Sequence, residues 1–102
     1  MSLILIDNIL AALRPHKNNF VLRQIGAQAL LYPVVKEVSS LDAYVTLNEL
    51  GLELWQQLIV AEKNPEAVFA SILAQYDCSP EELQADSLAF LEELSAFMLQ
   101  QH

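Results

Sequence analysis

The spacing of apolar residues changes once along the chain, near residue 47, and this change constrains the fold most strongly. Before it, short runs rich in β-branched and aromatic residues are separated by polar breaks, which is typical of strands. After it, apolar residues recur at helical intervals. The first helical face holds Leu47, Leu50, Leu54, Trp55, Leu58 and Ile59. The pattern predicts an α+β chain in which a small sheet precedes helices.

Three strands are expected in the first half of the chain. Residues 20–25 form the first run, and Gly26 can supply the turn into a second run over residues 28–35. Residues 36–40 are polar and are expected to form a loop. Residues 43–47 then form a third strand, so the sheet is a three-stranded antiparallel one.

Three helices are expected after the sheet. Asn48 can cap the first, but Thr46 and Glu49 also fit a capping box, so the helix start stays open between the two. The second begins at residues 64–66 (Asn-Pro-Glu), with a cap, a proline at the first helical position and an acid near the positive end of the helix dipole. The third begins at residues 79–82 (Ser-Pro-Glu-Glu), whose first and last side chains can cap reciprocally.

The first 19 residues fit two descriptions. Leu3, Ile6, Leu10 and Leu13 share a helical face, whereas Ile4 and Ile6 also alternate as in a strand. We expect an N-terminal arm or short helix over residues 1–19, packed on the domain of residues 20–99 or on a second copy in a homodimer.

The distribution of charge argues against nucleic acid as a partner. Of the 13 acidic residues, eleven lie in residues 41–102, where Lys63 is the only lysine or arginine. Such a surface repels phosphate backbones. The apolar run at residues 3–6 is too short to span a bilayer, and it lacks the features of a secretory signal. We therefore expect a cytoplasmic protein without a membrane partner.

The sequence offers no workable catalytic or metal-binding constellation. His16 and His102 stand far from each other and from any paired ligand residue. Cys78 is the single cysteine, and its nearest charged neighbours, Asp77 and Glu81, disfavour a reactive thiolate. There is no glycine-rich phosphate loop. We expect a protein that is not an enzyme and needs no metal or other cofactor.

Several short segments follow one another in a recognisable order: residues 30–32 (Leu-Leu-Tyr), 45–49 (Val-Thr-Leu-Asn-Glu), 54–58 (Leu-Trp-Gln-Gln-Leu), 72–77 (Ile-Leu-Ala-Gln-Tyr-Asp) and 86–94. Their order and spacing resemble those of the PqqD family. The resemblance runs from about Phe20 to Met98. Residues 61–64 replace the family's usual Asp-Gly turn, and residues 96–99 replace its usual glycine-containing ending. These departures leave open whether the pathway is PQQ synthesis or that of another peptide product.

The resemblance implies a winged-helix-like domain that acts as a peptide chaperone. Such a domain binds the leader of a ribosomally made precursor peptide as an added strand and presents it to a modifying enzyme, by analogy one of the radical-SAM class. Transferred to this chain, the implied contact residues are Ala43, Tyr44, Val45, Thr46 and Leu47 on the third strand and Asp86, Phe90 and Leu94 on the last helix.

The same residues also fit a purely structural role. Leu47, Phe90 and Leu94 are as well explained as core, and Asp86 with Glu93 as a solvated helix face. Because side chains alternate along a strand, Tyr44 and Thr46 project opposite to Val45, so only one of these sets can face a peptide.

Two other functions fit the same elements. One is a winged helix-turn-helix DNA-binding protein whose recognition helix spans residues 65–76. That helix carries Glu66 but no lysine or arginine, which phosphate contacts normally require. The other is a plain oligomerisation domain that pairs through an exposed apolar N-terminal arm.

Overall fold

The computed structural model describes residues 3–34 and 44–99. Its elements are, in chain order, α1 (Ile4–Leu13), the 3₁₀-helix η1 (Arg14–Asn19), β1 (Phe20–Ile25), β2 (Gln28–Pro33), β3 (Val45–Leu47), α2 (Glu49–Leu54), the π-helix η3 (Trp55–Val60), α3 (Pro65–Gln75) and α4 (Pro80–Leu99). This α+β order confirms the predicted change from strands to helices. The predicted loop at residues 36–40, together with Ala43 and His102, lies outside the described residues.

The sheet is antiparallel, with strand order β1-β2-β3. Gly26 makes the β1–β2 turn with φ 62°, a backbone conformation that glycine adopts without steric cost. The second strand is shorter than the predicted run over residues 28–35. It ends at Pro33, which pairs with Phe20, the first residue of β1; beyond it, the N–H of Val34 still donates to the carbonyl of Asn19 at 2.6 Å. The third strand begins at Val45, opposite Leu31, so Tyr44 precedes it, and residue 43 of the predicted strand lies outside the described residues.

The start of α2 is settled in favour of Asn48. Its side-chain Oδ1 accepts a hydrogen bond of 2.7 Å from the backbone N–H of Gly51, as an N-cap does. Helix α2 passes directly into the π-helix η3, where the N–H of Ala61 bonds to the carbonyl of Gln56 five residues earlier. One continuous helical segment therefore carries the predicted face from Leu50 to Ile59, whereas Leu47, which was placed on the same face, lies in β3.

The caps of the last two helices are as predicted. Asn64 Oδ1 accepts from the N–H of Glu66 at 2.8 Å and begins α3. Ser79 Oγ accepts from the N–H of Glu82 at 3.1 Å, while the Glu82 carboxylate accepts from the N–H of Ser79 at 3.5 Å. These reciprocal bonds satisfy N–H groups that the first turn of α4 would leave unpaired.

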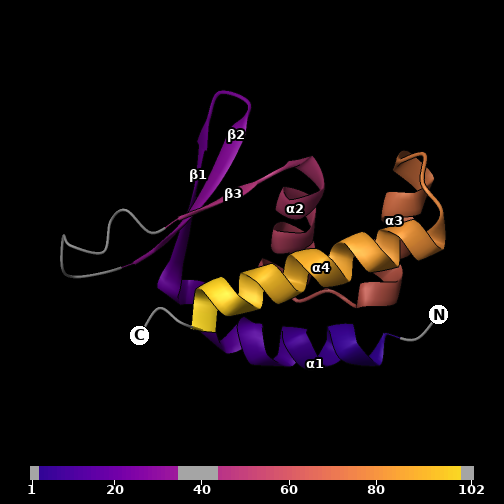
Figure 1. The fold of residues 1–102 in the computed structure, drawn as a ribbon, viewed down its shortest axis with the longest axis horizontal. Helices are drawn as coiled ribbons and strands as arrows, with labels where there is room; N and C mark the ends of the chain where they lie inside the picture. The colour runs from indigo at the N-terminus through magenta and orange to yellow at the C-terminus, as the bar shows by residue number, and fades with distance from the viewer. Residues whose placement is uncertain (1–2, 35–43, 100–102) are drawn as a thin grey trace.

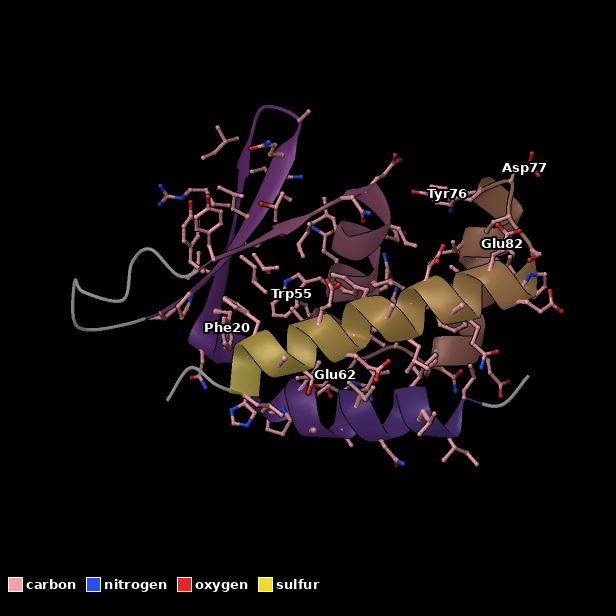
Figure 2. All side chains as sticks on the ribbon, viewed as in Figure 1. Phe20, Trp55, Glu62, Tyr76, Asp77 and Glu82 are labelled. Carbon is pink, nitrogen blue, oxygen red and sulfur yellow. The ribbon has the colours of Figure 1, made fainter. Side chains whose placement is uncertain are left out.

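Helix α4 crosses the middle of the molecule, with the sheet and α2 on one side and α1 on the other (Figure 1). Its buried face is Leu83, Ser87, Leu91, Leu94 and Met98. Figure 2 shows Phe20, at the start of β1, near the C-terminal end of α4. The rings of Phe20 and Phe97 have centroids 5.6 Å apart. Trp55, 3% exposed, belongs to the same core. Apart from η1, every other element contributes buried residues to the core in which α4 is embedded.

The N-terminal segment is a helix fastened to its own domain. Ile6, Leu10 and Leu13 are buried where α1 packs along α4. Arg14 then donates from Nε to the carbonyl of Leu58 and from Nη2 to that of Lys63, both at 3.0 Å. These carbonyls lie at the C-terminal end of η3, where a cation is favourable.

Lys17 strengthens the same junction. Its Nζ donates to the carbonyl of Val60 at 3.1 Å and to Glu62 Oε2 at 2.6 Å. The hydrogen bond and the positive charge of Lys17 lower the pKa of Glu62. Glu62 has a left-handed φ of 54°, in the turn where the related family carries Asp-Gly. The N-terminal cations thus hold a turn that glycine would form more easily.

We expect Arg14→Ala to lower the free energy of unfolding by about 1–3 kcal/mol, because two hydrogen bonds from a charged group to carbonyls are lost. Arg23→Ala is the matched control: this exposed arginine on β1 should contribute less than about 0.5 kcal/mol. Urea unfolding measures both. Equal effects of the two substitutions would contradict the structural role of Arg14.

A second close contact joins α2 to α4. A Cβ placed on Gly51 would lie 3.0 Å from Phe90 Cε1 and 3.2 Å from Asn48 Oδ1. Glycine at this position therefore lets the Phe90 ring lie against the first turn of α2.

We expect Gly51→Ala to destabilise the protein by about 1 kcal/mol, because the steric cost of the added methyl exceeds the gain in helix propensity. In the Phe90→Ala background the same substitution should be less destabilising, since the ring is gone and only the contact with Asn48 Oδ1 remains. A double-mutant cycle by urea unfolding measures the difference. Additive effects would show that Phe90 does not constrain Gly51.

Candidate functional site

An open groove of about 440 Å³ lies between the β3–α2 segment and α4. One wall comes from the end of β3 and the start of α2, and the other from one face of α4. Its lining residues are Thr46, Asn48, Leu50, Gly51, Asp86, Ala89, Phe90 and Glu93. In Figure 1, β3 and α4 run in opposite directions on the two sides of this site.

Strand β3 forms an edge of the described sheet. It pairs with β2 through Val45, Thr46 and Leu47, and no other described strand pairs with its far side. In an antiparallel ladder an edge strand directs part of its backbone N–H and C=O groups away from the sheet. These groups can receive another extended segment.

The groove has an apolar floor. Leu50 and Phe90 are partly buried and pack against the core while still lining the groove. Gly51 is buried between them, because it lacks the Cβ that would meet Phe90. Ala89 adds a small side chain beside Phe90. An apolar side chain of an incoming segment can therefore be buried here.

The helix wall of the groove is acidic. Asp86 and Glu93 are both exposed and lie seven residues apart on the same face of α4. No lysine, arginine or histidine is among the lining residues. The site therefore combines an edge strand, an apolar floor and two carboxylates.

A polar contact fixes the start of α2, which forms part of the site. The Tyr76 hydroxyl, at the end of α3, donates to Glu49 Oε1 at 3.2 Å. Partial burial, and then this bond to a carboxylate, raise the pKa of Tyr76. This bond links the end of α3 to the first turn of α2.

The contact residues that were predicted from the sequence, and that the structure describes, lie in three places: the groove, the core and the open surface. Thr46, Asp86 and Phe90 line the groove. Leu47 and Leu94 are 3% and 1% exposed and belong to the core, which Val45 also packs against.

Tyr44 occupies a different surface. It is 52% exposed, and its ring packs against that of Tyr32 in a tilted arrangement, with centroids 5.8 Å apart. Ala43 is outside the described residues. The strand residues therefore face three environments: groove, core and open surface.

Five lining residues were not among the predicted contact residues. They are Asn48, Leu50, Gly51, Ala89 and Glu93. A signal for the helix wall was present in the sequence, because positions 86, 89, 90 and 93 have the i, i+3, i+4, i+7 spacing of one face. The strand-side residues had no such signal, since they depend on how α2 packs against α4.

Other reactive groups do not gather in the described part of the chain. No three His, Cys, Asp or Glu side chains are grouped there so as to hold a metal ion. The Ser87 hydroxyl is fully buried and has no hydrogen-bond partner among these residues. Cys78 is half-buried. None of the described helices is long and apolar enough to cross a membrane.

A structural comparison finds the same fold in a solved structure described as TbiB1 in complex with the TbiA(β) leader peptide. The TM-score is 0.61 at 23% sequence identity, over 78% of this chain and 85% of that one. Among curated proteins, none matches the sequence.

The family model described as coenzyme PQQ synthesis protein D (PqqD) matches residues 28–96. The match includes β2, β3, the continuous segment of α2 and η3, α3 and most of α4. Both sides of the groove therefore lie inside it, whereas α1 and β1 precede it. The chain belongs to the PqqD family.

Proposed function

We propose that this protein is a non-catalytic recognition module that binds the leader segment of a ribosomally made precursor peptide and presents it to a modifying enzyme. The observation that carries the proposal is the edge strand β3 beside the groove of α4. Membership of the PqqD family supports it, as does the likeness to a protein whose structure is a complex with a leader peptide.

Strand addition suits this geometry. The backbone groups on the free side of β3 can hydrogen-bond to an extended peptide whatever its sequence, while the groove selects side chains. Strand β3 is only three residues long, so it offers few backbone bonds. Most of the binding free energy must then come from side chains that enter the groove.

Within the groove, Thr46, Phe90 and Asp86 are the proposed contact residues, and Tyr44 can extend the contact along the strand. Leu47 and Leu94 support the walls from the core. In this proposal the chemistry belongs to a separate enzyme, to which the module presents the peptide.

The modifying enzyme is expected to act in the cytoplasm, where the precursor is made. By family analogy it is a radical-SAM protein, and the pathway is that of PQQ or of another peptide product.

DNA binding is less well supported by the same structure. The exposed face of α3 presents Glu66, Ala67, Ala70, Ser71, Ala74 and Gln75, and the helix contains no lysine or arginine. A recognition helix without cations lacks the usual contacts to phosphate.

The test is calorimetric titration with the synthetic leader of the precursor peptide encoded beside this gene. We expect binding, with amide chemical-shift changes centred on residues 44–47. Phe90→Ala should weaken it roughly tenfold to a hundredfold, because a buried aromatic contact is lost.

Phe97→Ala is the matched control, since Phe97 packs on Phe20 away from the groove. It should leave the affinity of the folded protein unchanged. Absence of binding, or shift changes confined to α3, would exclude the proposed function.

A further inference from the structure

The charge of the groove points to one chemical class of peptide. We infer that the segment that occupies it carries a lysine or arginine two positions away from an apolar residue. The inference rests on the proposed function and adds the identity of the side chains that the groove selects.

Within the described residues, Asp86 and Glu93 have no internal counter-charge. Neither takes part in an ion pair there; the one salt bridge described joins Lys17 to Glu62. A strand laid over these two carboxylates removes water from them, and a cation on that strand would compensate the loss.

The described cations of the protein are placed elsewhere. Arg14 and Lys17 bond to carbonyls at the end of η3. Lys63 lines a separate hollow between η3 and α3, and Arg23 lies on β1, at the opposite edge of the sheet. An acidic peptide would therefore meet only like charges in the groove, whereas a basic peptide finds two unpaired carboxylates.

The spacing along α4 defines where the cation belongs. Phe90 lies about 6 Å along the helix axis from Asp86 and about 4.5 Å from Glu93, at 1.5 Å per residue. Side chains on one face of a strand recur about every 6.8 Å. If an apolar side chain of the added strand covers Phe90, its neighbours two positions away on either side lie near Asp86 and Glu93.

The apolar floor fixes that register. Phe90, Leu50 and Ala89 form the one apolar area in the lining, between the two carboxylates. An apolar side chain is stabilised there and nowhere else along the wall. The expected recognition element is thus an apolar residue with a basic residue at the second position before it, after it, or on both sides.

The experiment is a display selection of short random peptides on the full-length protein, followed by affinity measurement of the enriched peptides. We expect enrichment of the basic and apolar pair at this spacing. The double variant Asp86→Asn, Glu93→Gln should bind these peptides roughly tenfold more weakly, and raising the salt concentration should weaken the native protein more than the variant.

Glu92→Gln is the control, because this exposed residue on α4 changes the net charge without lining the groove. It should alter the affinity less than about twofold. Amide shift mapping of the native protein verifies that the selected peptides bind at residues 44–47.

Two results would overturn the inference, and they differ from each other. Peptides that bind at residues 44–47 without a basic residue, or with equal affinity for the double variant, would refute the charge preference and leave the proposed function intact. If no peptide is enriched at this strand, the proposed function fails, and the inference fails with it.

Discussion

The burial of one face of α4 is the constraint on which the rest of the structure depends. Leu83, Leu91, Leu94 and Met98 enter the core from this helix, and α1, α2 and the sheet pack around it. Because a helix has 3.6 residues per turn, burying that face fixes the direction of the opposite residues. Asp86, Ala89, Phe90 and Glu93 are thereby held along one line beside β3. The groove is a consequence of the core, and its shape can change only if the packing of α4 changes.

The uneven distribution of charge along the chain can also be explained by contacts in the structure. Arg14 and Lys17, two cations of the N-terminal segment, form their hydrogen bonds at and just after the end of η3. Together they bond to three carbonyls there, and Lys17 also pairs with Glu62. They stabilise a turn in which Glu62 adopts a left-handed φ. Because these bonds hold Arg14 and Lys17 at that turn, neither cation pairs with the acids of the groove in the described part of the chain. The charge distribution that argues against binding DNA is also the basis of the inferred preference for basic peptides.

Local patterns predicted the elements of this fold, and contacts between distant residues decided what the patterns left open. Asn64 and Ser79 could be recognised from the sequence as helix starts, because each side chain caps a backbone N–H no more than three residues further along the chain. The bonds of Arg14 to carbonyls more than 40 residues away leave no trace in the neighbouring sequence, so α1 could not be told from a loose arm. The π-helix η3 was missed for a related reason, since its apolar face satisfies an ordinary helical period as well. Asp86 and Phe90 were predicted as contact residues through the family resemblance. The role of Gly51 is evident only from the structure, in which the Phe90 ring lies close to it.

The short length of β3 determines how a site of this kind can be selective. An edge of three residues provides sequence-independent backbone bonds to any extended segment, but too few of them to bind tightly. The difference between one peptide and another must then arise from side chains over Leu50, Phe90 and the two carboxylates. Since Gly51 sets how closely Phe90 approaches α2, a single added methyl group there would change the depth of the apolar floor. Selectivity in this groove thus depends on the packing of α2 against α4 as much as on the residues that a peptide touches.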